Sequence, residues 1–261
     1  MSLPIVSEIN ATIPSTILEA ETMVHLDGVS VRYRVPHERY GTFKEYMIRR
    51  LQGRVNHREF WALKRVSLSV HRGEVFGLVG RNGAGKSTLL KVVSRVLRPT
   101  EGRVRVRGWV APLLELGAAF HHELTGRENV FLNAALMGHM RRDVEEKFDQ
   151  IVEFADLGGF IHAPLRTYST GMVARLGFAV ATAWEPDVLV LDEVLAVGDE
   201  AFQRKCHARI RNFRERGATV LMVSHNATTV VENCQRAAWI DHGEIQIIGA
   251  PDEVVAKYQA S

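Results

Sequence analysis

The hydrophobic and polar positions of this chain change their spacing from segment to segment. Apolar and polar residues alternate from Met23 onward, as in a half-buried strand, and again from Ala62 to Val70. Three continuous apolar runs, Val75–Val79, Val188–Leu191 and Ala218–Val223, have the length of fully buried strands. The pattern therefore predicts a sheet whose central strands are covered on both faces.

Helical patterns lie between these strands. A helix is expected from Lys86, and further helical stretches are expected over 126–162, 171–184 and about 200–216. Short β segments over 104–114 and a closing hairpin, Ala237–Ile248, complete the pattern. Strands that alternate with helices around a glycine-rich turn indicate an α/β fold with a parallel sheet, in which the helical middle is an insertion.

The same pattern sets the expected domain boundaries. Residues 1–22 are polar and mixed, and we expect a flexible tail there. One domain should span 23–258, with its core formed by 23–115 and 180–258 and a helical subdomain over about 116–179.

Composition narrows the class of protein. The 261 residues are 46% hydrophobic and 24% charged, which is ordinary for a globular chain. Two cysteines without metal-ligand spacing fit a reducing compartment. No apolar run approaches 18 residues and no basic leader precedes an apolar core, so we expect neither a membrane span nor a secretory signal.

The net charge of the whole chain is less informative than the charge of one segment. A net charge of +3 gives no reason to expect a nucleic-acid partner. The segment from Arg32 to Arg72, however, holds nine Arg and two Lys against three Glu. Such a stretch suits a membrane surface, another protein or a phosphate-rich ligand, and a solvated basic face is the alternative.

A phosphate-binding loop follows the strand Val75–Val79. The pattern G-x-x-x-x-G-K-[ST] is matched by Gly80, Arg81, Asn82, Gly83, Ala84, Gly85, Lys86 and Ser87. Glycines let backbone N–H groups surround phosphate oxygens, and the next helix directs its positive end at them. Lys86 is expected to reach the β- and γ-phosphates, Ser87 to ligate Mg²⁺, and Thr88 to support the α- and β-phosphates.

An acidic pair ends the strand Val188–Leu191. A buried strand there would deliver Asp192 to the phosphate-loop edge of the sheet, where its carboxylate can hold Mg²⁺ through water. Glu193, one residue on, is suited to polarise an attacking water as general base. This acidic pair lies about 100 residues after the phosphate loop. The two features together predict an ATP-hydrolysing site.

With these elements and one more segment, the sequence resembles the ATP-binding cassette (ABC) family over about residues 24–258. That segment is Tyr168-Ser169-Thr170-Gly171-Met172-Val173-Ala174-Arg175, which looks like the family's signature loop. The resemblance implies a P-loop NTPase with a RecA-like core, an antiparallel β subdomain and an inserted helical subdomain. It also implies that Ser169, Thr170 and Gly171 grip ATP bound to a second copy of the chain, so that the working form is a homodimer. Thr170 and Met172 depart from the usual Gly and Gln.

Further residues match the family in order. His225 looks like the switch histidine that contacts the γ-phosphate, and Asp199 looks like the acid of the D-loop, which couples the two sites. Tyr33 is the expected adenine-stacking aromatic, with Tyr40, or a plain core or surface tyrosine, as the alternatives. The Gln usual between the phosphate loop and the helical region is missing, and Glu115 stands in its place.

The signature variant and the loop around Glu115 resemble those of bacterial exporters of O-antigen, teichoic acid, capsule and cell-wall galactan. The insertion 41–53 places Phe43 and Met47 at helical spacing among basic residues, as in a helix at a membrane interface; packing on the chain's own core is the alternative. The resemblance implies an ATPase subunit of a polysaccharide exporter, paired with an integral membrane permease pair at the cytoplasmic face of the bacterial inner membrane.

Three other readings compete. A soluble ABC ATPase would act without a permease, an ABC exporter would carry a substrate other than a glycan, and a regulatory cassette would not hydrolyse ATP. The residue set Lys86, Asp192, Glu193 and His225 argues against the third. Nothing in the sequence identifies the sugar.

Overall fold

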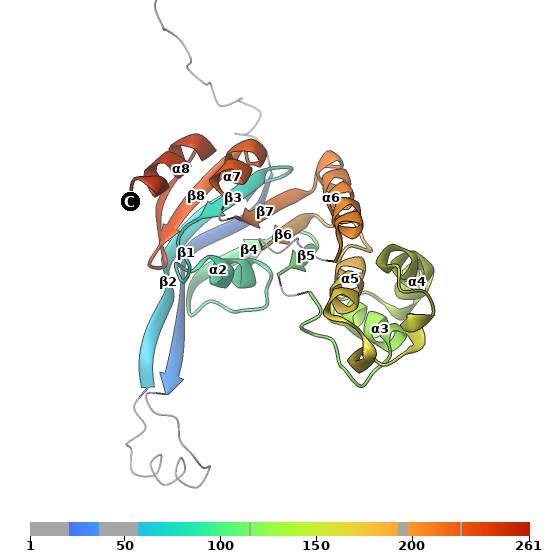
Figure 1. The fold of residues 1–261 in the computed structure, drawn as a ribbon. Helices are drawn as coiled ribbons and strands as arrows, with labels where there is room; N and C mark the ends of the chain where they lie inside the picture. Colours follow the sequence, from blue (N-terminus) through green and yellow to red (C-terminus); the bar gives the residue numbers. More distant parts are fainter. Residues whose placement is uncertain (1–20, 37–56, 115, 193–197, 225) are drawn as a thin grey trace, which may run out of the picture.

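The computed structural model describes residues 21–36, 57–114, 116–192, 198–224 and 226–261. Its larger sheet has six strands in the order β5-β6-β7-β3-β8-β9, all parallel to their neighbours except β9, which runs antiparallel to β8 (Figure 1). In chain order the strands are β3 (Val75–Val79), β5 (Val110–Leu113), β6 (Val188–Leu191), β7 (Thr219–Val223), β8 (Arg236–Asp241) and β9 (Glu244–Gly249). This arrangement confirms the predicted parallel α/β core.

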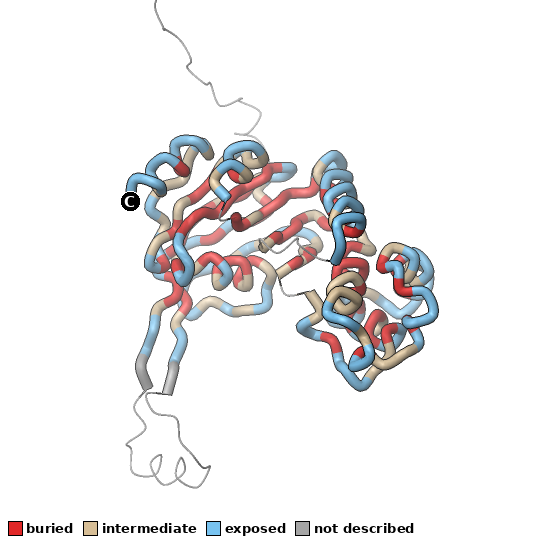
Figure 2. The backbone as a smooth tube through the Cα atoms, viewed as in Figure 1, coloured by how far each residue is buried: buried red, intermediate tan, exposed pale blue. Residues whose placement is uncertain are grey.

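The central strands are buried because both faces of the sheet are covered. Every residue of β3 and β6 is buried, as their continuous apolar sequences require (Figure 2). Helix α2 (Lys86–Val93) covers one face, where Leu89 and Leu90 pack in the same cluster as Val190 and Leu221. The other face is covered by α6 (Glu200–Glu215), α7 (Ala227–Asn233) and α8 (Pro251–Gln259).

A smaller antiparallel sheet, in the order β2-β1-β4, lies against the opposite side of α2. It consists of β1 (Thr22–Pro36), β2 (His57–His71) and β4 (Glu101–Val106). Strands β1 and β2 pair from end to end and extend beyond the core as a long hairpin (Figure 1). The predicted antiparallel β subdomain is therefore confirmed, although β2 begins five residues before the expected Ala62.

A helical unit lies beside the core and has its own apolar interior (Figure 1). It contains α3 (Gly126–Leu136), α4 (Arg141–Ala155), two short 3-10 helices, η2 (Gly158–His162) and η3 (Leu165–Thr167), and α5 (Thr170–Ala181). The prediction of continuous helix over 126–162 was wrong, because Gly138 adopts a left-handed φ of 92° and turns the chain between α3 and α4.

An aromatic stack joins this turn to the core. The His139 ring lies parallel to that of Trp184, with 3.7 Å between centroids, and edge-on to Trp109 at 5.0 Å. Its Nε2 is buried and has no hydrogen-bond partner among the described residues. Burial lowers the pKa of His139, and the nearby carboxylate of Asp143 opposes this.

Two residues of the expected tail, Glu21 and Thr22, make defined contacts. Glu21 accepts hydrogen bonds from Arg72 and Arg107, and β1 starts at Thr22, so these two residues belong to the domain and not to the tail expected over 1–22. The insertion 41–53 and Tyr40 lie outside the described residues. Among the residues that are described, no helix is long and apolar enough to cross a membrane.

Candidate functional site

Three parallel strands bring their carboxyl ends to one edge of the larger sheet. β3 leads into the phosphate loop, β6 ends before Asp192, and β7 ends before Ser224. β7 lies between β3 and β6, so the acidic end of β6 is two strands from the loop. A pocket of about 280 Å³ at this edge is lined by Asn82, Gly83, Gly85, Lys86, Ser87, Thr88 and Asp192, among others. Ligands of open α/β sheets bind at such an edge.

The loop's glycines allow close packing as well as backbone freedom. Gly80 has a φ of 153°, and a Cβ there would lie 2.2 Å from the carbonyl oxygen of Ile240 in β8. Gly85 has a φ of 112°, and its Cβ would lie 2.6 Å from the carbonyl oxygen of Ala62 in β2. The loop is therefore fixed between two strands, and any side chain at these two positions would displace it.

The Lys86 side chain is held by the loop itself. Its Nζ donates to the carbonyl oxygens of Gly80, at 2.6 Å, and Arg81, at 2.9 Å. Lys86 is 6% exposed, and burial lowers its pKa, while the carboxylate of Asp192 raises it. A buried ammonium at the start of a helix is a strong site for a phosphate group. Arg81 is exposed and takes part through its backbone, whereas Ala84 is buried beneath the loop.

An aromatic pair forms another wall of this pocket. Tyr33 of β1 stands opposite Phe60 of β2, and both rings line the pocket. They are 38% and 55% exposed, respectively. Sequence reasoning placed Tyr33 here and missed Phe60, because it began the second strand at Ala62. The alternation of Phe60 with Ala62 on a longer strand was the available signal.

The signature segment forms a separate helix N-terminus. Ser169 is the N-cap of α5, and its Oγ accepts a hydrogen bond from the backbone N–H of Met172 at 3.2 Å. Ser169 and Thr170 are exposed, and the described lining of the phosphate pocket includes neither of them nor Gly171. Within one copy, the phosphate-loop pocket and the N-terminus of α5 are therefore separate features.

An ion pair joins the signature helix to α6. Asp199 caps α6 by accepting from the Phe202 backbone N–H at 2.8 Å, and this bond is the largest cause of its lowered pKa. The other carboxylate oxygen pairs with Arg175 of α5, whose guanidinium also lies 5.3 Å from the centre of the Phe202 ring. Arg175 belongs to the signature segment identified in the sequence, but sequence reasoning did not predict its ion pair with Asp199, 24 residues away.

Three expected site residues, Glu193, His225 and Glu115, lie outside the described residues. Two of them directly follow, in the sequence, described residues at this edge of the sheet. Asp192, which lines the pocket, is the residue before Glu193. Ser224, which follows β7, is the residue before His225. The roles given to all three remain predictions.

The chain was compared with known proteins. The family model "ABC transporter" matches residues 63–196. Two Klebsiella pneumoniae proteins, both named O-antigen export system ATP-binding protein RfbB, are similar to it. One is 50% identical over 202 residues, covering 77% of this chain and 82% of the relative, and the other is 43% identical over 241 residues, covering 92% and 98%. Teichoic acids export ATP-binding protein TagH of Staphylococcus haemolyticus is 39% identical over 236 residues, covering 90% and 88%.

Solved structures agree on the fold. An ATP-binding subunit of an ABC transporter aligns with a TM-score of 0.67 at 21% identity, covering 91% of this chain and 94% of the other. A dimeric ATP-binding cassette bound to ADP and Pi aligns with a TM-score of 0.66 at 22% identity, covering 88% and 99%. The family model spans half of the chain, and the three relatives span between 77% and 92% of it. The chain therefore belongs to the ABC transporter family, as an ABC-type ATP hydrolase.

Proposed function

We propose that this chain is the ATP-binding and ATP-hydrolysing subunit of an exporter that moves a lipid-linked polysaccharide across the cytoplasmic membrane. The observation that carries the proposal is the 43% identity, over 92% of the chain, to an O-antigen export ATP-binding protein. The pocket at the phosphate loop and the separate signature helix supply the parts that an ATP-driven subunit needs.

Two copies would close on two ATP molecules. In each copy the phosphates lie on the loop N–H groups and Lys86, and the adenine lies against Tyr33 and Phe60. The second copy brings Ser169 and the N-terminus of its α5 to the γ-phosphate. Because these contacts form only in the closed pair, ATP binding favours closure, and loss of the γ-phosphate reopens the pair.

The pocket also fits a magnesium ion. Ser87 and Asp192 line it together and offer the hydroxyl and carboxylate oxygens that Mg²⁺ prefers. When bound with ATP, the ion would neutralise developing charge on the phosphates. Glu193 acts as general base on the attacking water, and His225 contacts the γ-phosphate.

A second pocket suits a membrane partner. It has a volume of about 240 Å³, lies between the core and the helical unit, and is lined by apolar residues that include Leu114, Leu116, Phe120 and Met137. Leu114 and Leu116 flank Glu115 on either side. A segment of the permease pair seated here would sense the position of the helical unit. We place the chain at the cytoplasmic face of the inner membrane, with the helix proposed for 41–53 in peripheral contact with lipid.

Purification together with the permease tests this function. The chain is co-expressed with the permease in its native bacterium, extracted in detergent, and the bound lipids are identified by mass spectrometry. A lipid-linked glycan should co-purify, and it should accumulate in cells that carry Lys86→Ala. Recovery of the chain outside membrane fractions despite the permease would favour a soluble ATPase, and accumulation of another substrate would favour a non-glycan exporter.

Substitution of the proposed base tests ATP hydrolysis separately from the identity of the exported substrate. Glu193→Gln should leave ATP binding intact, trap a dimer that size-exclusion chromatography detects, and abolish phosphate release. Unchanged turnover in this variant would remove Glu193 as the base without affecting the assignment of the cargo.

A further inference from the structure

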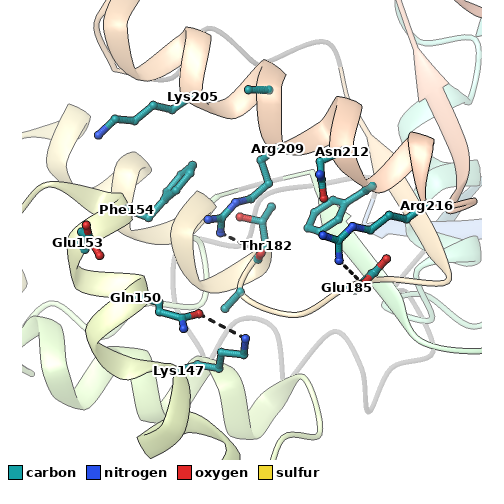
Figure 3. Close-up of a pocket in the computed structure, with 13 residues that line it drawn as sticks. Lys147, Gln150, Glu153, Phe154, Thr182, Glu185, Lys205, Arg209, Asn212 and Arg216 are labelled. Atoms are coloured by element: carbon teal, nitrogen blue, oxygen red, sulfur yellow. Dashed lines mark hydrogen bonds and ion pairs between the residues drawn. The ribbon is translucent and has the colours of Figure 1, made fainter.

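A polar groove separates the helical unit from the core, away from the phosphate pocket (Figure 3). Its volume is about 730 Å³, which exceeds that of the phosphate pocket. α4 forms one wall, α6 forms the other, and the segment after α5 forms the base. None of the functions proposed above uses this groove.

Cations outnumber acids along its walls. Lys147 on α4, Lys205 and Arg209 on α6, and Arg216 directly after α6 line it, against the two carboxylates Glu153 and Glu185. Glu185 is already paired with Arg216 at 3.2 Å. Three cations therefore face one remaining carboxylate. Such an imbalance attracts an anionic partner.

Arg209 is held in place before any partner arrives. Its guanidinium lies over the Phe154 ring, 3.8 Å from the centroid, and its Nη1 donates to the Thr182 carbonyl oxygen at 3.1 Å. Figure 3 shows the side chain between Phe154 and Thr182, at the centre of the groove. Partial burial lowers its pKa, so the charge is held where water screens it less. A guanidinium carries five N–H donors, and this contact uses one of them.

The polar groups are spread along the groove rather than gathered at a point. Along one face of α6 and its C-cap lie Lys205, Arg209, Asn212 and Arg216, over a distance of about 16 Å at the usual helical rise. The half-buried ring of Phe154 lies among them, and the buried ring of Phe213, 7% exposed, lies beneath. A small anion needs donors that converge, whereas an extended peptide meets cations and apolar contacts in succession along its length.

We propose that the groove between α4 and α6 binds an acidic, extended segment of a partner protein. Carboxylates of that segment would pair with Lys147, Lys205 and Arg209, and its apolar side chains would contact the half-buried ring of Phe154.

A peptide-binding assay tests the proposal. The probe is a fluorescein-labelled peptide of about ten residues in which glutamate alternates with leucine, long enough to span the groove. Fluorescence polarisation with the full chain should show saturable binding. The double variant Lys147→Glu/Lys205→Glu should raise Kd at least about tenfold, since two attractive pairs become repulsive.

A matched control separates the groove from general attraction. Arg142→Glu/Arg211→Glu makes the same change in charge on the same two helices, at exposed positions outside the groove, and should leave Kd within about twofold. Both double variants should keep the ATPase activity and melting temperature of the parent, which distinguishes this test from those of the proposed function. Absence of peptide binding, equal weakening by both variants, or displacement of the peptide by inorganic phosphate at matched ionic strength would overturn the proposal.

Discussion

The second glycine position of the signature segment offers a way to separate folding from ATP turnover. Gly171 is the second residue of α5 and directly follows the exposed Ser169 and Thr170 in the sequence. A Cβ added there would meet only the Ser169 Oγ, at 3.8 Å, which is ordinary van der Waals contact. The backbone at this position is not left-handed, so alanine is not strained. Gly171→Ala therefore fits the isolated chain.

The expected effect on folding is small and favourable. Replacing a helical glycine by alanine typically stabilises by about 0.5–1 kcal/mol. For a domain of this size that corresponds to a rise in Tm of about 1–4 °C. Differential scanning fluorimetry of the purified chain measures this directly.

The expected effect on turnover is large. In the closed pair the new methyl group would lie where the second copy's γ-phosphate approaches the α5 N-terminus. A displacement of about 1 Å at a reacting group costs about 100-fold in rate. ATP hydrolysis, measured as phosphate release, should fall by that factor while ATP binding to the phosphate loop is retained.

Gly159→Ala is the control. Gly159 lies in the same helical unit, and a Cβ there would meet nothing within 4 Å. This variant should hydrolyse ATP like the parent. Two results would refute the reasoning: full ATPase activity in Gly171→Ala, which removes the contact between copies, or a large drop in its Tm, which makes the glycine structural.

Three further predictions follow from the site and its surroundings. Arg175→Ala removes the ion pair to Asp199 and should lower ATP turnover about tenfold, measured as phosphate release. The free energy of unfolding, measured in urea, should fall by no more than about 1 kcal/mol, because Asp199 is 60% exposed. Phe60→Ala should weaken ATP binding by about 1 kcal/mol, a roughly fivefold higher Kd by titration of a fluorescent ATP analogue, while unchanged affinity would remove Phe60 from the adenine site. Because the pKa of His139 is lowered, the unfolded chain takes up a proton below about pH 6.5 that the folded chain resists, so stability is lost as pH falls below that value. His139→Phe should reduce the fall in Tm between about pH 7.5 and pH 5.5, and an unaltered fall would assign it to other groups.

The local sequence was sufficient to predict the limits of those strands and helices whose own residues determine where they begin and end. β3 and β6 have the predicted limits, because each is a continuous apolar run that ends at a glycine loop or an acidic residue. The start of α2 at Lys86 follows from the phosphate-loop pattern. The signature segment was likewise predicted to open a helix, and Ser169 caps it.

Features that depend on distant contacts could not be predicted. β2 extends back to His57 because its residues pair with the far end of β1, and the local alternation around Phe60 does not by itself fix where the strand begins. The turn at Gly138 is a different case: a glycine within a helical pattern is a local signal for a left-handed turn, and the prediction of one continuous helix overlooked it. The Arg175–Asp199 pair and the position of Arg209 over Phe154 join residues 24 and 55 positions apart, and helical periodicity does not specify such partners.

The measurement that tests the central claim most directly is an assay of ATP-driven translocation of a lipid-linked polysaccharide. The chain and its permease are reconstituted in proteoliposomes that contain the labelled glycan lipid, and the glycan that reaches the opposite leaflet is measured after ATP is added. We predict translocation that requires ATP and is lost in Lys86→Ala, whose ammonium is held at the phosphate loop. ATP hydrolysis without any translocation, or equal translocation by Lys86→Ala, would contradict the account.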